Sequence, residues 1–464
     1  MKPPLSVLTL CLLLSACSTP AQRPDSGIQP PAAWQSPHTA GAVHDNRQWW
    51  NRFGSPQLGR LIEQARLGSY DLAAAIARVR QAQADTVIAG GSQLPEVKAA
   101  ANANRQKLMR GSGYSQLDAD SDNDAVDYFN ANLVASYEID FWGGQRASRD
   151  SAQFSLDASE FDQATVELTL LSSVANSYAQ ALSLQEQSRI AELNLANAQS
   201  VLKLVQTRFD SGSATALELA QQKSLVAAQQ RQLPLVRQQT EEARISLAAL
   251  LGRPVQALSL GQERFDQLTW PAIDAGVPSQ LLSRRPDIAR AEAQLAAAQA
   301  DVTVARAAML PTVTLTAEIG SGADRADDIL RSPFYNLSAG LLAPVFNNGR
   351  LGAQRDKATA RQQELLETYR GAIINGFADV EKALNSIRGL DEQRGWQSEE
   401  LSQAQTAFNI AQSRYQAGAE DLLTVLETQR TLYAAQDLNV QLRLSRMQAS
   451  IALYKALGGG WQVL

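Results

Sequence analysis

The sequence predicts an α+β membrane protein made of two tandem structural repeats, in which long helices lead into β-strands. The first observation is an internal match: residues 71–97 align without a gap on residues 287–313, with 12 of 27 positions identical. Each copy has an Ala-rich helical pattern that stops at Leu-Pro and then alternates with period 2. The second is four segments of about ten residues that are apolar on one side and polar on the other. The third is the absence of proline from residue 96 to residue 233 and after residue 344, which favours very long helices.

Composition and charge exclude several classes of function. A net charge of -5 with 19% charged residues provides no basic stripe, so nucleic acid is not an expected partner. Hydrophobic residues make up 45% of the chain but aromatic residues only 6%, which suits closely packed long helices. Both histidines, His38 and His44, precede the repeats, and so do both cysteines. The repeats therefore lack the residues of a Ser-His-Asp triad or a His-based metal site, and we expect neither an enzyme nor a cofactor.

The N-terminus predicts a lipoprotein. Residues 1–16 read as a signal peptide, whose apolar run of eleven residues, Ser6–Ala16, is too short to cross a bilayer as a helix. The run ends in Leu-Ser-Ala-Cys17, which resembles a bacterial lipobox, so that Cys17 becomes the lipidated first residue. Ser18 then implies sorting to the outer membrane. The alternative is an ordinary signal peptide that happens to carry a cysteine. Residues 17–54 are Pro-rich and indicate an extended tether.

The two repeats have the same expected order of elements. Residues 55–252 form repeat 1, with a helix from Pro56 to about Ala89, strands over about 95–106 and 128–141, and long helices. Residues 279–458 form repeat 2, with strands over about 311–320 and 334–344. A small mixed equatorial belt, residues 253–278, joins the repeats, and residues 459–464 are a tail. The strand pattern suits lipid on one face and water on the other, although a half-buried soluble strand has the same alternation.

The long helices end in matching glycine turns. From about Arg146 to Arg208 the helical pattern is continuous, and about 60 residues reach roughly 90 Å. Arg208 opens one turn, which contains Gly212; Arg414 and Tyr415 open the other, which contains Gly418. Glycine at this place suits a helix C-terminus with a left-handed residue. A coiled-coil seam with 3-4 spacing leads into the second turn, at Leu401, Ala404, Phe408, Ala411 and Tyr415.

Four strands per chain are too few to close a barrel. An open sheet edge in lipid leaves backbone groups unpaired, so copies must pool their strands: two give eight, three give twelve and four give sixteen. Helices of this length need neighbours for the same reason. A closed sheet that continues into a closed ring of helices is a tube, and its physical task is conduction.

Two local patterns do not carry chemistry. Residues 118–129 resemble the start of a calcium loop, but Asn123 and Phe129 stand where such a loop needs glycine and glutamate. A solvated loop is the better interpretation. Glu138 and Asp140 are two residues apart on a strand and share one face, without a nucleophile, a metal or a phosphate loop beside them. We therefore interpret both carboxylates as lining a pore.

Six motifs follow one another along the chain: WWNRFGSPQLGRLI (49–62), YEIDFWGG (137–144), VPSQLLSRRPDI (277–288), PVFNNGRL (344–351), RYQAGAEDLLTVLETQRTLYAAQ (414–436) and ALYKALGGGW (452–461). In this order they resemble the TolC-type outer-membrane efflux family, and the lipobox resembles its lipoprotein branch, similar to OprM and NodT. The resemblance implies a homotrimer with a 12-stranded transmembrane barrel, a periplasmic α-helical barrel of twelve helices and a location in the outer membrane. It also implies two protein partners, a periplasmic adaptor (membrane fusion) protein and an inner-membrane pump of the resistance-nodulation-division type.

The resemblance further implies a gate at the periplasmic tip. The family's leucine and acidic ring fall on Leu423 and Glu427, with Arg430 one turn further on, and Glu218 matches the acid of the neighbouring helix pair. Both acids are glutamate here, where relatives often have aspartate. Like charges that converge on an axis repel one another and need a cation to stay close. The alternative interpretation makes these residues ordinary pairs on a helix surface.

The expected function is therefore a passive exit duct of a tripartite efflux pump for drugs or other small solutes. The nearest alternative is the same duct with another cargo or another pump: it would serve a metal-ion pump, a major-facilitator pump or a protein-secretion system. A different class is a structural helical lipoprotein, which would have no membrane strands and no pore.

Overall fold

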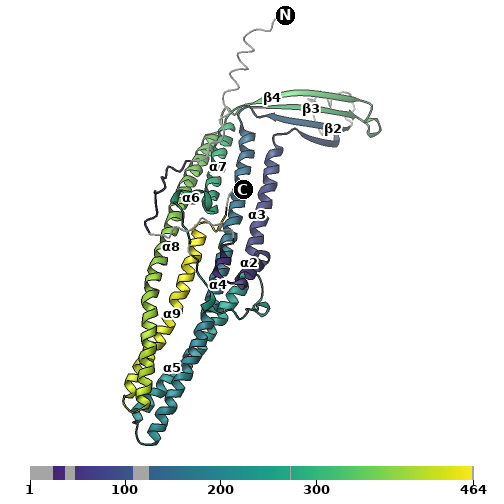
Figure 1. Cartoon of the computed structure of the whole chain (residues 1–464). Coiled ribbons are helices and arrows are strands. Elements are labelled where there is room, and N and C mark those ends of the chain that lie inside the picture. Colours follow the sequence, from purple (N-terminus) through teal and green to yellow (C-terminus); the bar gives the residue numbers. More distant parts are fainter. Residues whose placement is uncertain (1–24, 37–47, 108–124, 272, 462–464) are drawn as a thin grey trace. The chain divides into compact units, whose positions relative to one another are not determined.

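The structure is a computed structural model that describes residues 25–36, 48–107, 125–271 and 273–461 (Figure 1). It is mostly helical, with one small antiparallel sheet, as the sequence predicts. No described helix combines the length and the apolar character that crossing a membrane requires. Cys17, the signal peptide and most of the calcium-loop-like segment at residues 118–129 lie outside the described residues. The chain divides into two compact units, which are described in turn.

The elements follow one another in two similar series, each with a short helix, a longer helix, two strands and a hairpin of two long helices. Their order is η1 (Trp49–Phe53), α2 (Pro56–Gly68), α3 (Tyr70–Gly91), β1 (Glu96–Gln106), β2 (Val126–Ile139), α4 (Gly144–Asp210), α5 (Ala216–Leu250), η2 (Val255–Ala257), η3 (Phe265–Gln267), α6 (Pro278–Arg284), α7 (Pro286–Ala307), β3 (Thr312–Ala323), η4 (Ala326–Asp328), β4 (Pro333–Leu342), α8 (Arg350–Gln416) and α9 (Leu422–Ala456).

Three pairs of corresponding helices in the two series have equal lengths, whereas α2 has 13 residues and α6 has seven. Helices α3 and α7 each span 22 residues, α4 and α8 each span 67, and α5 and α9 each span 35. The single helix expected from Pro56 to about Ala89 is in fact two helices, because Ser69 is extended and separates α2 from α3. Pro286 makes the same break between α6 and α7, since a proline disfavours helix at the preceding residue. Helix α5 continues through Pro234.

Unit 1 comprises residues 1–27, 79–159 and 291–369 and contains the sheet. The strands lie in the order β1-β2-β3-β4, and all three pairings are antiparallel. Their bounds differ from the expected ones by up to three residues, because alternation does not mark where pairing ends. Side chains of β1 and β4 are exposed along both strands, and neither strand has a second neighbour in the sheet.

Polar side chains meet across the sheet and at its junction with the helices. On the polar face, Asn132 Nδ2 donates to Glu318 Oε1 at 2.5 Å. Asp140, the residue that follows β2, accepts from the backbone N–H groups of Gln145 and Arg146 at 3.1 and 2.9 Å. It therefore caps the start of α4, where a carboxylate also favours the positive end of the helix dipole. This contact gives Asp140 a structural role beyond the expected pore lining.

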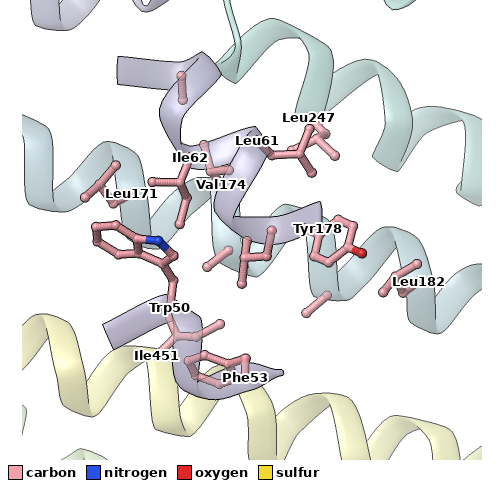
Figure 2. Packing of buried hydrophobic residues seen from close by; sticks show 14 of the residues in the cluster. Trp50, Phe53, Leu61, Ile62, Leu171, Val174, Tyr178, Leu182, Leu247 and Ile451 are labelled. Carbon is pink, nitrogen blue, oxygen red and sulfur yellow. The ribbon is translucent and has the colours of Figure 1, made fainter. Parts of the chain in front are cut away.

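Unit 2 comprises residues 28–78, 160–290 and 370–464 and contains the largest hydrophobic core. The core joins α2 to α4, α5 and α9, as Figure 2 shows: Leu61 points toward Leu247, and Ile62 toward Val174. Trp49 is fully buried and stacks on Tyr454 of α9, with ring centroids 5.3 Å apart. The Trp-Trp motif that opens the folded part is therefore core.

The belt between the series is fastened to this core by a carboxylate. Glu263 accepts hydrogen bonds from the Ser55 hydroxyl, from Tyr178 Oη at 2.7 Å and from the backbone N–H of Gln57 at 3.0 Å. Burial opposes ionisation of Glu263, but hydrogen bonds from Ser55 and Tyr178 outweigh it and lower the pKa of the carboxyl. Ser55 also caps α2, since its Oγ accepts from the N–H of Leu58 at 2.9 Å. The Glu263 carboxylate thus links the belt to the N-terminal cap of α2 and to Tyr178 of α4.

The described part of the N-terminal segment is anchored on α8. Trp34 is buried, and its Nε1 donates to the Gly276 carbonyl at 2.9 Å. Its ring lies edge-on to Phe377, 6.2 Å between centroids. The backbone N–H groups of Gln35 and Ser36 donate to the Glu381 carboxylate at 2.6 and 3.2 Å. The segment expected to be only a tether therefore makes a specific attachment.

Candidate functional site

The candidate site is the end of unit 2 where the two long hairpins turn. Gly212 and Gly418 have positive φ values of 76° and 79°, a conformation that favours glycine. The N–H of Ser213 donates to the Arg208 carbonyl at 2.7 Å, and that of Ala419 to the Arg414 carbonyl at 2.9 Å. These bonds close the C-termini of α4 and α8 in the same way.

Each return helix begins with a side-chain cap that sequence reasoning missed. The Thr215 hydroxyl oxygen accepts from the N–H of Glu218 at 3.2 Å, while the Glu218 carboxylate accepts from the Thr215 N–H at 2.6 Å. This is a reciprocal capping box, and its Thr-x-x-Glu spacing is visible in the sequence. Asp421 caps α9 by accepting from the Thr424 N–H at 2.9 Å. Glu218 is thus held at the helix start by its own hydrogen bonds.

One arginine joins the two turns. The Arg208 guanidinium lies over the Tyr415 ring, 4.6 Å from its centroid, and Nη1 donates to the Tyr415 carbonyl at 3.0 Å. Arg414 stays within its own turn and pairs with Glu420 at 3.3 Å. Of the turn residues expected from the sequence, the structure therefore brings Arg208 and Tyr415 together across the two hairpins.

A narrow core supports the tip. Seam residues Ala404, Phe408, Ala411 and Tyr415 of α8 are buried with Val205 of α4 and with Leu422, Val425 and Leu426 of α9. Gln222 is fully buried and donates to the Ala198 carbonyl at 2.9 Å. Tyr433 donates to the Asn194 carbonyl at 2.8 Å, and burial raises its pKa to about 12. The Gln222 bond fixes α5 against α4 within the first hairpin, and the Tyr433 bond fixes α9 of the second hairpin against α4, because buried donors left unpaired are costly.

The remaining residues that the sequence places at a gate share one face of α9. Leu423, Glu427 and Arg430 are all exposed, and Leu423 keeps 54% of its surface accessible. Spacings of four and three residues place them on the side opposite the buried Val425 and Gln429. Within the described parts of the chain, no ion pair joins Glu427 to Arg430. A single chain thus presents an acid, a cation and a leucine with no covering group.

Comparisons with known proteins identify the family. The sequence model described as "Outer membrane efflux protein" matches residues 61–253 and 277–459. The chain belongs to the outer membrane efflux protein family. Its matched segments contain both helical hairpins, both turns and the four strands.

Similar proteins cover the whole chain. The pyoverdine export outer membrane protein OpmQ of Pseudomonas aeruginosa is 64% identical, over 99% of this chain and 97% of its own length. The cation efflux system protein CusC of Escherichia coli O6:H1 is 30% identical, over 99% of both chains. Among solved structures, the outer-membrane channel OprN aligns with a TM-score of 0.87 and 26% identity, over 96% of this chain and all of that one.

Membership settles the class of protein and its location. Members of the outer membrane efflux protein family are transport channels of the outer membrane and not enzymes. The predicted TolC-type resemblance is confirmed. The structure adds three features that sequence reasoning did not predict: the cap at Thr215, the cap at Asp421 and the Arg208–Tyr415 contact.

Proposed function

We propose that this family member is the trimeric exit duct of a tripartite export system. The observation that carries the proposal is the open sheet: β1 and β4 each have one neighbour, so each leaves one edge unpaired. Unpaired backbone groups within lipid cost several kcal/mol each. Copies of the chain remove that cost by pairing β4 of one with β1 of the next, and three copies make a 12-stranded barrel.

The helices of unit 2 support the same assembly. Trp396 and Ile410 of α8 keep 80% and 54% of their surface exposed, and Ile245 of α5 keeps 52%. Large apolar side chains on hairpin surfaces favour burial against another chain. Three copies then supply twelve helices to a periplasmic barrel. Through that barrel we expect contact with a periplasmic adaptor and an inner-membrane pump of the resistance-nodulation-division type.

The proposed cargo is pyoverdine. Identity of 64% to OpmQ extends over 99% of the chain, so the duct wall as a whole resembles that of a pyoverdine exporter. CusC, a cation efflux protein, is 30% identical over the same length and supports cations as a second candidate cargo. The channel itself is passive, since the pump selects and drives the cargo.

The proposed gate lies at the periplasmic tip. Leu423 and Glu427 on the exposed face of α9 would meet their copies around the axis, with Arg430 offsetting the carboxylates. Glu218 lies at the start of α5 and contributes a further acid to the ring. Like charges held close together in a narrow ring repel one another, so the closed and the open gate would differ little in free energy. Contacts from an adaptor would therefore open the gate.

Export by living cells tests the function. The full-length chain is expressed in a strain that lacks its outer-membrane pyoverdine exporter, and pyoverdine is measured in the medium and the periplasm. We expect the chain to restore pyoverdine to the medium. Unchanged periplasmic accumulation with correctly localised protein would reject pyoverdine as cargo, and a metal-cation tolerance assay in the same strain would then examine cations.

Cysteine cross-linking tests the assembly. The repeats contain no cysteine, so pairs introduced along the open edges, beginning with Ala99→Cys in β1 and Leu337→Cys in β4, can join only as designed. When the two cysteines are in register, oxidation should give covalent trimers on a denaturing gel. Control variants with a single cysteine, in β1 or in β4, can give dimers at most. A set of pairs that yields no product above the monomer would contradict the shared barrel.

A further inference from the structure

A cavity in unit 2 lies where the two series meet. It has a volume of about 640 Å³ and is lined by side chains of α4, the start of α7, the middle of α8 and the end of α9. Its charged lining residues are Arg285, Asp287, Asp379, Lys382 and Lys455. Two of the sequence motifs, residues 277–288 and 452–461, each supply part of the lining, but the cavity forms only when four separate segments pack.

In one part of the cavity wall, the charged groups are paired with one another. Arg285 is buried and donates to Asp287 at 2.7 and 3.0 Å, to Asp379 at 3.1 Å and to the Ala456 carbonyl at 3.2 Å. Burial opposes ionisation of Asp287, but the hydrogen bond from Arg285 outweighs it and lowers the pKa of the carboxyl. The donors of Arg285 are therefore used within the protein and are not available to a ligand.

The other charged part of the wall has spare donors. Lys382 and Lys455 are exposed, and neither ammonium has an ion pair or a hydrogen bond with any described residue. Gln448 and Ser445 of α9 line the same cavity and add neutral donors. Two ammonium groups beside amide and hydroxyl donors suit a ligand that carries more than one negative charge.

The cavity opens on the face of α8 that points away from the belt. Trp34 and its neighbours contact α8 at Phe377, Val380 and Leu384. Asp379, Lys382 and Ser386 line the cavity. At about 100° per residue these two sets lie on opposite sides of the helix. We take the belt to lie on the outer surface of the proposed tube, which turns the cavity toward the lumen.

We propose that this cavity is a binding station for small polyanionic solutes in the wall of the duct, with Lys382 and Lys455 as its anion-binding residues. The proposal rests on the proposed duct, because only a lumen brings the cavity into contact with cargo. Its ligand class is solutes with two or more carboxylate or phosphate groups, and citrate is the probe. Arg285, Asp287 and Asp379 hold the cavity open and position α7 against α9.

Citrate titration of the purified full-length channel tests the site. At low ionic strength, we expect saturable binding by calorimetry, and Lys382→Gln/Lys455→Gln should bind at least tenfold more weakly. The control Lys203→Gln/Lys223→Gln removes the same charge from exposed positions outside the cavity and should bind as the parent does. Gln448→Glu keeps both lysines and adds a carboxylate, so it should also weaken binding, whatever the double variant does to folding.

The possible outcomes separate the site from the duct. Equal citrate affinity in the parent, the cavity variant and Gln448→Glu would overturn the proposal, as would a parent that shows no saturable binding. Conductance in planar bilayers is recorded for the same preparations. A conducting channel without citrate binding rejects the anion site alone, whereas a preparation that never conducts rejects the duct on which the site rests.

Discussion

The Arg208 guanidinium covers the ring of Tyr415 at 4.6 Å and hydrogen-bonds its carbonyl, so the turn of the first hairpin is fastened to the end of α8 in the second. Both residues lie in turns that the sequence shows to be equivalent, yet only the first arginine crosses over. Arg414 pairs with Glu420 inside its own turn. At the tip, Arg208 therefore joins the two hairpins of one chain through a contact between unlike partners, beside the apolar core that the hairpins share.

Arg208→Ala should loosen the tip without unfolding the protein. Loss of one half-buried cation–π contact and one hydrogen bond lowers the free energy of local opening by about 1–2 kcal/mol. Hydrogen exchange should quicken at Ser213, Gly418 and Ala419. Arg231→Ala, an exposed arginine within α5, is the matched control. Equal exchange in Arg208→Ala and the parent would show that the contact does not hold the turns together.

Glu427→Ala should make the channel conductance larger or less steady. Removing the proposed ring of like charges, while the Arg430 cations remain, changes how closely the α9 helices approach the axis. Single-channel recording in planar bilayers measures the effect. Glu400→Ala removes an exposed acid of α8 and should conduct like the parent. Traces of Glu427→Ala that match those of the parent would remove the gate assignment.

Glu263 should make the belt sensitive to acid. Its folded-state pKa is lowered, so its contribution to stability is complete above its unfolded pKa of about 4.3 and disappears as the pH falls through the lower folded value. The melting temperature of Glu263→Gln should therefore be below that of the parent at neutral pH and approach it below about pH 4. A difference that stays constant over this pH range would show that the carboxylate charge is not involved.

Trp34→Ala should release the N-terminal segment from α8. Truncation of a buried tryptophan destabilises the folded state by about 3–5 kcal/mol, which is more than the two backbone hydrogen bonds to Glu381 contribute to stability. Limited proteolysis with mass analysis should show faster cleavage before Trp49. Trp34→Phe keeps an aromatic ring but loses the bond to Gly276, so it should be cleaved at an intermediate rate. Cleavage of Trp34→Ala at the parental rate would mean that other contacts hold the segment.

Cys17→Ser should leave a protein that folds but is mislocalised or poorly anchored. The substitution removes the thiol that the lipobox presents for lipid attachment and leaves the repeats unchanged. Membrane fractionation measures the effect, and mass analysis of the parent's N-terminal peptide checks for the lipid. An unlipidated parent would remove the lipoprotein assignment.

Sequence reasoning worked best where structure follows a local period. Helical spacing before each Leu-Pro and alternation after it predict a mostly helical chain with an antiparallel sheet, and the structure confirms this. It failed at the expected helix from Pro56 to Ala89, which breaks at Ser69. The break between α6 and α7 is marked by Pro286. The break between α2 and α3 has Gly68-Ser69 instead: Ser69 Oγ accepts from the N–H of Leu72 at 3.4 Å, and a Cβ at Gly68 would lie 2.4 Å from the Leu251 carbonyl oxygen.

The sequence by itself determined the family, the paired hairpins and the positions of the tip turns, because repeats, periods and glycines act over a few residues. Only the tertiary structure decided which partners those residues meet. Arg208 reaches Tyr415, Glu263 joins Ser55 to Tyr178, and Trp34 lies against Phe377. Each contact spans tens to hundreds of residues, and its energy depends on burial and direction, which no local pattern records.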